Sequence, residues 1–367
     1  MKQPFTRTVR RLAIATTAVT AATGMALALA APAQAARPTA AEKQSVRWLG
    51  GQLTDGVMHN DQYDFDDIGL TLDAGLALAA LDKRPADVEA IQSALGDDIE
   101  GYTTYNGDVY AGSVAKALAF TTVSGGDYTD VGGVNLRHRL HQLVIREGSS
   151  TGRIADHSDG TDYANTIGQA FAVQGLSLSD SGQAKKVIRF LLKQQCDTGY
   201  FRLQFNDDKD AKNQGCGGPG TNTPSVDVTA LAVIALQDTH QMGKQVRSAQ
   251  QHAVAWLLSQ QGSDGSFAGA PPTDSANTNS TGLASWALGS SGVCRPARQA
   301  AVWVRGLEVP PNDDSALADE TGAIAYDAAA YQAGESDGIT TATRDQWRRA
   351  SAQAAPALRY LRRSNCA

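Results

Sequence analysis

Residues 229–236 read Thr-Ala-Leu-Ala-Val-Ile-Ala-Leu, a stretch without charge that would be apolar on every side of a helix. A helix of this composition is expected to be buried, whereas a helix with one polar face contacts water. The pattern of a Thr or Ser with an apolar residue seven positions later occurs six times, at intervals of 40 to 63 residues. Its anchors are Thr71, Ser113, Thr166, Thr229, Thr281 and Thr321. A self-similar unit of this length indicates a helical repeat protein.

Each copy of the pattern follows an amphipathic stretch, of which residues 249–258 are a clear example. The two stretches predict an outer helix that contacts water and an inner, Ala-rich helix that packs closely on its neighbours. Six such pairs are expected to close into a ring, because closure leaves no apolar end exposed. We therefore predict an all-α fold, a single α/α toroid of six outer and inner helix pairs over residues 36–343. Residues 344–367 are expected to form a C-terminal helix docked on the toroid.

The first 35 residues have the features of a secretory signal peptide. Four basic residues lie among the first 11, an uncharged stretch covers residues 12–31, and Ala-Gln-Ala at 33–35 supplies a cleavage site. The adjacent Arg10 and Arg11 leave open whether export uses the general or the twin-arginine route. No later stretch is apolar for long enough to span a bilayer. The sequence therefore predicts a secreted, extracellular protein.

The balance of charges restricts the possible partners. The whole chain has a net charge of -6, and loss of the four basic residues of the predicted signal peptide would bring it to -10. Nucleic-acid binding needs clustered basic residues that neutralise phosphates, so we expect no nucleic-acid partner. The expected ligand is a small molecule or a glycan. The oligomeric state stays open.

Four cysteines lie outside the predicted signal peptide, at positions 196, 216, 294 and 366. An even number of cysteines in an exported protein predicts two disulfides, with three possible pairings. We favour Cys196–Cys216, which would close the long loop of repeat four, and Cys294–Cys366, which would tie the C-terminal tail to repeat six. A zinc site is the competing interpretation, but no CxxC spacing or nearby pair of histidines supports it. We therefore expect no metal and no cofactor.

The ends of two outer helices carry a more specific signature. The Trp-Leu pair at 256–257 and the Phe-Leu pair at 190–191 are each followed, at the same spacings, by a Gln, a Gly and a Phe. These residues are Gln195, Gly199, Phe201, Gln261, Gly265 and Phe267. The signature resembles the QW motif of the terpenoid cyclase and protein prenyltransferase superfamily, which implies a toroid in which each Gln caps a neighbouring helix. Degenerate copies lie near Leu143 and Trp48, whereas repeats two and six lack one.

Residues 64–67 read Asp-Phe-Asp-Asp and match the DxDD motif of the squalene-type cyclases in this superfamily. The resemblance implies that Asp64, Asp66 and Asp67 form an acid site in which Asp66 donates a proton to an alkene or an epoxide. This chemistry needs a carboxylic acid that stays neutral because of burial and neighbouring carboxylates. The alternative is that the three acids cap the start of a helix and complement its dipole.

The spacing of this motif departs from the family pattern. In the family the motif runs directly into the Thr of the inner helix, whereas three residues separate Asp67 from Thr71 here. In the proper register, Asp227 takes the place of the acid, two residues before Thr229, but without flanking acids. Carbocations also need a lining of aromatic faces, and only 6% of this chain is aromatic.

A second group of acid and base side chains, with Asp156, His157 and Tyr163, precedes the predicted inner helix of repeat three. Secreted α/α barrels that cleave glycans place such groups in loops of this kind. The sequence therefore offers this loop as a candidate glycan site. A solvated polar turn is the alternative.

Parallel inner helices would bring their N-termini together at one mouth of the ring. The acids and amides near those N-termini would then surround the mouth. They are Asp67, Asp162, Asp227, Asn279, Asp319 and Glu320. Capping of the helices explains them structurally, and a polar rim around a ligand cavity explains them functionally.

A complete scaffold without an intact catalytic motif favours a secreted ligand-binding or interaction module that uses the central cavity. Two enzymatic alternatives stay open. The first is a protonation-initiated terpene cyclase that uses the DxDD acids, and the second is a glycan-active enzyme that uses the loop at 156–163.

Overall fold

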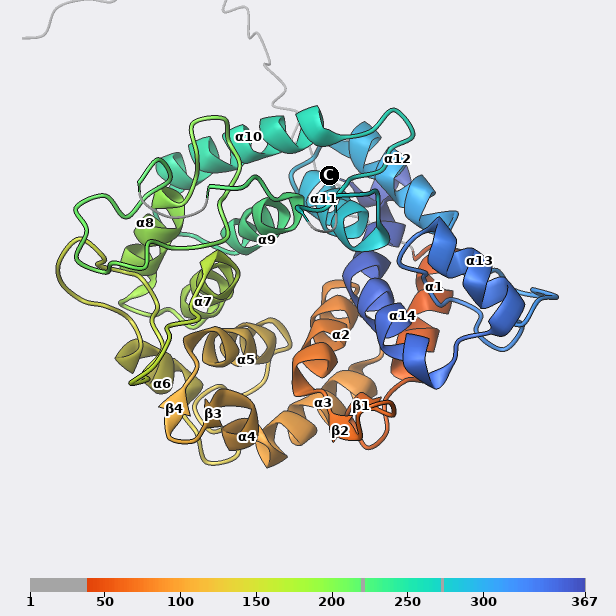
Figure 1. The fold of residues 1–367 in the computed structure, drawn as a ribbon, viewed down its shortest axis with the longest axis horizontal. Coiled ribbons are helices and arrows are strands. Elements are labelled where there is room, and N and C mark those ends of the chain that lie inside the picture. The colour runs from red at the N-terminus through yellow and green to blue at the C-terminus, as the bar shows by residue number, and fades with distance from the viewer. Residues whose placement is uncertain (1–37, 219–221, 272–273, 367) are drawn as a thin grey trace, which may run out of the picture. The chain divides into compact units, whose positions relative to one another are not determined.

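The computed structural model describes residues 38–218, 222–271 and 274–366, and the predicted signal peptide lies outside them. Within the unit that begins at Arg37, twelve main helices of the described residues form two concentric layers (Figure 1). The inner helices are α2 (Ile68–Ala80), α5 (Ala111–Val123), α7 (Thr166–Leu178), α9 (Val226–Gln237), α11 (Thr278–Ser290) and α14 (Thr341–Ala354). The outer helices are α1 (Ala40–Gly50), α3 (Pro85–Asp97), α6 (Leu136–Gln142), α8 (Ala184–Lys193), α10 (Gly243–Gln260) and α12 (Cys294–Arg305). The predicted all-α toroid is confirmed.

Shorter elements lie between the helix pairs and at the C-terminus. Two hairpins are formed by β1 (His59–Asn60) with β2 (Phe65–Asp66), and by β3 (Thr104–Tyr105) with β4 (Asp108–Val109). The remaining helices are α4 (Ile99–Thr103), α13 (Ala328–Asp337) and the 3-10 helices η1 (Ala355–Leu361) and η2 (Arg363–Asn365).

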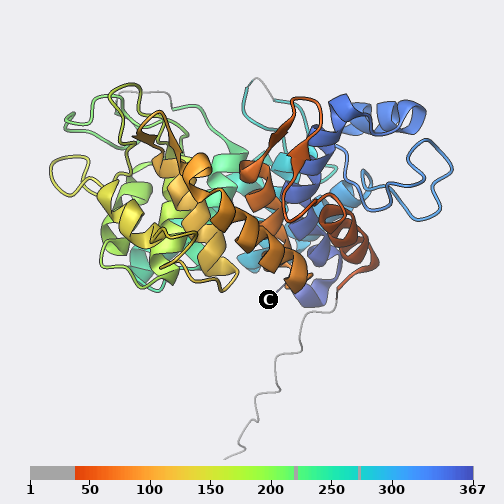
Figure 2. The same cartoon turned by 90° about the horizontal axis from the view of Figure 1, so that it is seen from below.

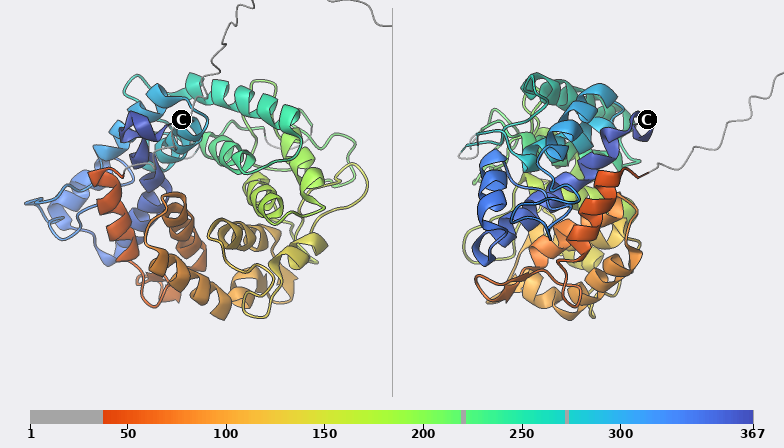
Figure 3. Two further views of the ribbon diagram at one scale, coloured as in Figure 1. Left: turned by 180° about the vertical axis from the view of Figure 1, so that it is seen from behind. Right: turned by 90° about the vertical axis from the view of Figure 1, so that its right-hand side faces the viewer.

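Contacts between neighbouring inner helices run around the whole ring. Each inner helix contacts the next, and α14 contacts both α11 and α2, so the layer is closed. Alanines such as Ala117, Ala172 and Ala232 are completely buried, and their small side chains allow the close approach. The two ends of the described chain also meet, because α1 contacts η1 and the Thr39 hydroxyl donates to the Leu358 carbonyl at 3.2 Å (Figure 3).

The inner helices run in one direction, so their N-termini share one face of the ring, which we call the mouth face (Figure 2). Both hairpins project from this face (Figure 2). The connections on the opposite face are mostly short, as between α2 and α3 or between α11 and α12, whereas the mouth face carries long ones such as residues 194–225. Long loops held by a rigid scaffold are where binding residues concentrate.

A shared hydrogen bond explains the anchor pattern in the sequence. The backbone N–H of Phe201 donates to the Thr229 hydroxyl at 3.0 Å, so the turn after α8 is fixed to the first turn of α9. Thr71 and Thr281 accept the same bond, each at 2.9 Å, from the turns that precede their helices. In repeat three the acceptor is the Gln169 side chain rather than the predicted Thr166. At Thr71, Thr229 and Thr281 the anchor is therefore a buried acceptor for an otherwise unpaired N–H group.

The two strong copies of the Gln and Gly signature connect each repeat to the next. The Gln261 side chain donates to the carbonyls of Gly265 at 3.1 Å and of Pro296, on α12, at 3.0 Å. Gln195 makes the equivalent pair of bonds to its own turn and to α10. Gly265 has φ +96°, and a Cβ there would collide with the α12 backbone, so only glycine permits this packing.

Repeat six corrects the sequence-based register. Thr321 does not open an inner helix, since residues 321–327 form turns and the Ala-rich stretch after them is the mostly exposed α13. The sixth inner helix is α14, where the Ser351 hydroxyl accepts from the Ile324 N–H at 2.9 Å. The tail expected to dock on a finished ring thus completes the ring. The backbone pairing that accompanies the signature is also present in repeat six, because Glu308 pairs with Ile324 as Gln195 pairs with Phe201.

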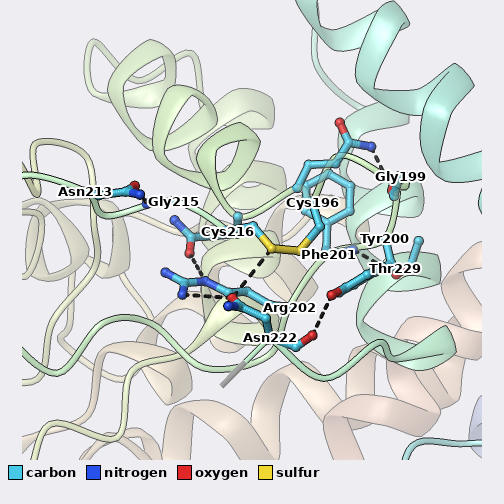
Figure 4. The surroundings of a disulfide bond; sticks show 12 residues. Cys196, Gly199, Tyr200, Phe201, Arg202, Asn213, Gly215, Cys216, Asn222 and Thr229 are labelled. Carbon is cyan, nitrogen blue, oxygen red and sulfur yellow. Dashed lines mark hydrogen bonds between the residues drawn. A yellow bond between two sulfur atoms is a disulfide. The ribbon is translucent and has the colours of Figure 1, made fainter. Parts of the chain in front are cut away.

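Both predicted disulfides are confirmed. Cys196–Cys216 closes the loop before α9, and Cys294–Cys366 joins α12 to the C-terminal tail. Arg202 lies beneath the first disulfide and is completely buried (Figure 4). Its guanidinium donates to the Gln194 side chain at 2.9 Å and to the Gln214 carbonyl at 3.0 Å. The long loop is therefore held by a covalent bond and a buried polar network.

Candidate functional site

A cavity of about 370 Å³ lies inside the ring of inner helices, and all six of them contribute to its wall. We call it the ring cavity. Most of its wall is apolar, and the large apolar side chains that line it are Leu76, Phe171, Leu231, Ile234, Leu283 and Trp286. Its size lies within the range of small-molecule pockets, and apolar walls with a few polar groups are typical of them.

An ion pair lies in the wall of the ring cavity. Lys116 of α5 contacts Asp73 of α2 at 2.6 Å and donates to the Gly69 carbonyl at 2.8 Å. Its ammonium group also lies 5.9 Å from the centre of the Phe171 ring. Burial alone would lower the pKa of Lys116, but the nearby Asp73 outweighs it and the pKa is raised. The cavity therefore holds a charged pair without a net charge.

A second polar pair lies where α7 and α9 end. The Gln174 side chain donates to an Asp238 carboxylate oxygen at 2.6 Å, and both residues line the ring cavity. Burial raises the pKa of Asp238, and the bond from Gln174 only partly opposes this effect. Asp238 is thus a carboxyl group that favours its neutral form more than a free aspartic acid does.

A second pocket, of about 330 Å³, opens beside the N-termini of α5 and α7. We call it the mouth pocket. It is lined by Tyr102, Tyr110, Ser113, Asp156, Tyr163 and Asn165, among others. Three further residues, Lys116, Ile167 and Phe171, line both cavities. The two cavities therefore adjoin each other at the Lys116 side chain.

The acids of the loop at 156–163 are engaged in holding the loop. One Asp156 oxygen accepts from the Ala111 N–H at 2.7 Å, which caps α5, and the other accepts from the Tyr163 N–H at 2.8 Å. Asp162 pairs with Arg153 at 2.8 Å and with Lys209 at 3.0 Å. With both oxygens of Asp156 occupied, the loop presents Tyr163 rather than a free catalytic acid.

The pKa values in this loop follow from these contacts. Burial raises the pKa of Asp156, and the two backbone N–H groups oppose that rise. Burial also acts to raise the pKa of Asp162, but its hydrogen bonds and positive neighbours lower it overall. His157 is exposed, and its backbone pairs with Val109. We find no acid and base pair in this loop that could cleave a glycan.

The DxDD acids lie on the β1–β2 hairpin and do not reach the ring cavity. The side chains of Asp64 and Asp66 are 97% and 59% exposed, and both contact His59, whose pKa the Asp66 bond raises. Asp67 caps α2 through the Leu70 N–H at 2.8 Å and pairs with Arg349. None of the three acids lines the ring cavity or the mouth pocket, and Asp67 caps a helix, so the geometry favours the capping interpretation of Asp67 over the acid site.

Asp227 has the opposite surroundings. It lies in the first turn of α9, burial raises its pKa, and one carboxylate oxygen has no hydrogen-bond partner among the described residues. The side-chain oxygens of Asn279 and Ser280 on α11 are also buried without a partner there. The Ser280 hydroxyl is near enough to oppose the rise in the pKa of Asp227 slightly.

The other predicted rim residues do not surround the ring cavity. Glu320 accepts from the Trp48 indole at 2.7 Å and from Arg344 at 2.9 Å, so it links α1 to α14. Asp319 is exposed. Of the eleven candidate catalytic and binding residues, only Asp156 and Tyr163 line a cavity described here, the mouth pocket.

The polar residues of the ring cavity were not among the candidates predicted from the sequence. Asp73 and Lys116 are the single charged residues of inner helices that are otherwise without charge. A charge in a helix that is expected to be buried could have indicated a polar site. Asp238 follows the last residue of α9 and resembled an ordinary helix end. Within the described ranges, no group of residues is arranged to hold a metal ion, and no helix is both long and apolar enough to cross a bilayer.

Solved structures with the same fold share little sequence with this chain. A protein from Actinoplanes matches with a TM-score of 0.59 and 16% identity, over 87% of this chain and 98% of that one. The type II terpene cyclase MstE from Scytonema, in complex with geranylgeranyl dihydroxybenzoate, matches with a TM-score of 0.57 and 16% identity, over 87% of this chain and 95% of that one. These likenesses show the α/α toroid fold.

A more distant match extends the range of chemistries found on this scaffold. Cellobiose 2-epimerase from Bacillus thermoamylovorans matches with a TM-score of 0.50 and 10% identity, over 66% of this chain and 76% of that one. No protein-family profile and no curated protein matches the sequence. Since one fold can carry several activities, the function has to be argued from the cavities.

Proposed function

We propose that the protein binds an apolar small molecule in the ring cavity and acts as a secreted binding module. The observation that carries the proposal is the cavity itself. A space of about 370 Å³ is lined by Phe171, Trp286 and aliphatic side chains, in the centre of a fold whose inner helices could have filled it. Binding of a ligand in such a cavity would be favoured mainly by the apolar surface that the ligand buries there.

The exposed acids support a binding module over a cyclase that uses the DxDD motif. Asp66 lies on a hairpin at the surface and is absent from the wall of either cavity. A proton donor for an alkene must be kept neutral and near the substrate. Asp66 is 59% exposed and lines neither cavity, so the sequence match alone would have to carry that mechanism.

Two further assignments belong to this proposal. We assign Gln195, Gly199 and Phe201, together with Gln261, Gly265 and Phe267, to QW repeats, because their contacts connect successive repeats. We also propose export through the N-terminal segment, with which the two disulfides agree, since disulfides persist in oxidising compartments.

Fluorescence can test occupancy of the ring cavity. Trp286 lines the cavity, so an apolar dye such as Nile red, bound there, should quench its emission by energy transfer. We expect saturable quenching in the wild type and less of it in Trp286→Phe, because Trp286 is the tryptophan in the cavity wall, with the dye affinity little changed. Trp303→Phe, on the outer helix α12, is the matched control and should keep the quenching. Quenching that is unsaturable, or that Trp286→Phe reduces no more than Trp303→Phe does, would contradict the proposal.

A protonation-initiated terpene cyclase is the second candidate, with Asp238 rather than Asp66 as the acid. Asp238 lines the ring cavity and has a raised pKa, and Phe171 and Trp286 supply aromatic faces for a carbocation. In this step a proton moves from the Asp238 carboxyl group to an alkene carbon. Loss of a proton from the cyclised cation would end the reaction and restore the acid.

Product analysis separates the two candidates. Polyprenyl alcohols and diphosphates incubated with the wild type should yield cyclic products only if the cyclase is correct. Asp238→Asn should then remove them, and Asp66→Asn should not. Binding of the polyprenyl compounds without any product supports the binding module instead.

A further inference from the structure

The mouth pocket adjoins the ring cavity and differs from it in chemistry. Apolar surface predominates in both walls, but tyrosine rings with hydroxyl groups, Ser113 and Asn165 line the mouth pocket, whereas aliphatic side chains with Phe171 and Trp286 line the ring cavity. Lys116, Ile167 and Phe171 are common to both walls, so a molecule that crosses this shared boundary contacts both compartments. A single ligand of sufficient length would therefore meet a mostly aliphatic wall at one end and a wall of tyrosine rings and hydroxyl groups at the other.

The charged groups of the mouth pocket are already compensated. Lys116 is paired with Asp73 at 2.6 Å. Asp156 accepts two backbone N–H groups, one at each oxygen. The pocket thus offers no unpaired charge to a carboxylate, phosphate or ammonium group, and desolvating such a group there would cost free energy.

Aromatic faces and free hydroxyl groups are what the pocket does offer. The Tyr110 and Tyr163 rings lie 6.4 Å apart at an angle of 46°, and Tyr163 is 67% exposed. Among the described residues, neither of their hydroxyl groups forms a hydrogen bond. A tyrosine combines a flat apolar face with a polar tip, so it suits a ligand ring that carries hydroxyl groups.

We infer that the ligand is an uncharged amphiphile, with an apolar body in the ring cavity and a hydroxylated ring, of the kind found in a sugar or a polyol, against Tyr110 and Tyr163 in the mouth pocket. This inference rests on the proposed binding function of the ring cavity and adds the chemistry of the ligand's other end. The Asp73–Lys116 pair lies at the boundary between the two ends and supplies both a donor and an acceptor there.

Displacement of Nile red by synthetic amphiphiles tests the inference, at concentrations below micelle formation. The probes are dodecyl β-glucoside, octyl β-glucoside and dodecanoate. The wild type should prefer dodecyl glucoside to dodecanoate, which has a charged head, and to octyl glucoside, which has a shorter body. A preference for dodecanoate would overturn the inference of an uncharged head.

Two tyrosines of similar exposure provide a matched pair of variants. Tyr163→Ala should weaken dodecyl glucoside binding about 3- to 10-fold, the loss expected for one aromatic contact, and should leave Nile red binding unchanged. Tyr63→Ala removes a tyrosine that is 69% exposed on the β1–β2 hairpin and lines neither cavity, so it should change neither affinity. Because both side chains are exposed, both variants should fold.

The outcomes separate this inference from the proposed function. If Nile red binds but Tyr163→Ala and Tyr63→Ala affect dodecyl glucoside equally, the head-group site is wrong and the ring cavity remains a binding site. If Nile red does not bind the wild type, the proposed function itself fails. Equal affinities for octyl and dodecyl glucoside would show that the body does not enter the ring cavity.

Discussion

The acids of the β1–β2 hairpin and Asp227 stand before the first and the fourth anchor, Thr71 and Thr229, yet their surroundings are opposite. Asp66 matches a catalytic motif letter for letter and is 59% exposed, in contact with a histidine. Asp227 lacks the flanking acids, but it is largely buried, its pKa is raised, and one oxygen has no described partner. The comparison teaches that burial, and not the motif, decides which carboxyl group has a raised pKa.

Glu308 is a further buried carboxyl group, and its replacement should have the largest effect on stability. Burial raises its pKa to about 8, despite Arg305 at 3.5 Å, and neither of its oxygens has a hydrogen-bond partner in the described chain. The folded state therefore favours the protonated form, and its contribution to stability is lost as the pH rises from the ordinary value near 4.5 through 8. Glu308→Gln should raise the free energy of unfolding at pH 9 by about 2–5 kcal/mol.

The same variant provides its own control. Near pH 4.5 or below, both states of the wild type hold the proton, so the gain of Glu308→Gln should nearly vanish in urea unfolding experiments at low pH. Gln195 already occupies the equivalent position in repeat four and bonds to two carbonyls. A variant that is less stable than the wild type at pH 9 would mean that Glu308 is ionised and stabilised by Arg305.

Asp67→Ala should have the next largest effect, and it tests the structural interpretation of the motif. Asp67 caps α2 and pairs with Arg349. Loss of the cap and of the partly exposed ion pair should lower the free energy of unfolding by about 1–2 kcal/mol. Asp67→Asn, which keeps a capping oxygen, should lose less than half of that. Equal losses in the two variants would contradict the capping role.

Asp227→Asn should have a smaller effect, and of the opposite sign. Burial raises the pKa of Asp227, so its stabilising contribution is lost as the pH rises. Replacement by the neutral amide should therefore stabilise the protein by about 1 kcal/mol at pH 8, relative to the wild type. The gain should shrink at pH 5. A loss of stability at both values would show that Asp227 is a paired, ionised group.

Asp66→Asn should have the smallest effect. The side chain is exposed and its contact with His59 is a surface pair, so the free energy of unfolding should change by less than about 0.5 kcal/mol. Titration of His59 by NMR should show a lower pKa in this variant, because the Asp66 bond raises it. An unchanged His59 pKa would show that Asp66 does not form a hydrogen bond with His59.

The fold was predictable because the helix pairs repeat the same physical pattern. The same features recur along the chain at intervals of 40 to 63 residues. They are the Ala-rich inner helices, the amphipathic outer helices and, in some repeats, the Gln and Gly signature. The prediction failed where the chain departs from that period. In repeat six, Gly322 follows Glu308 by fourteen residues instead of the four that separate Gly199 from Gln195, and the Ala-rich α13 imitates an inner helix.

The candidate site was less predictable, because it depends on packing. The sequence identified Asp156 and Tyr163, which line the mouth pocket, since they belong to a dense group of polar residues. It did not identify the ring cavity, because the side chains that line it are the same Ala, Leu and Ile that fill an ordinary core. Whether six such helices leave a space of about 370 Å³ depends on their separation, which no local pattern encodes.

The central claim is that the ring cavity, and not the hairpin acids, is the functional site. The most direct test is the dissociation constant of Nile red for Ala235→Trp, which places an indole in the cavity wall, compared with that for Asp66→Asn. We predict at least about tenfold weaker binding in Ala235→Trp, because the added ring occupies the ligand's space, and wild-type affinity in Asp66→Asn. Wild-type affinity in a folded Ala235→Trp, or loss of binding in Asp66→Asn, would contradict the claim.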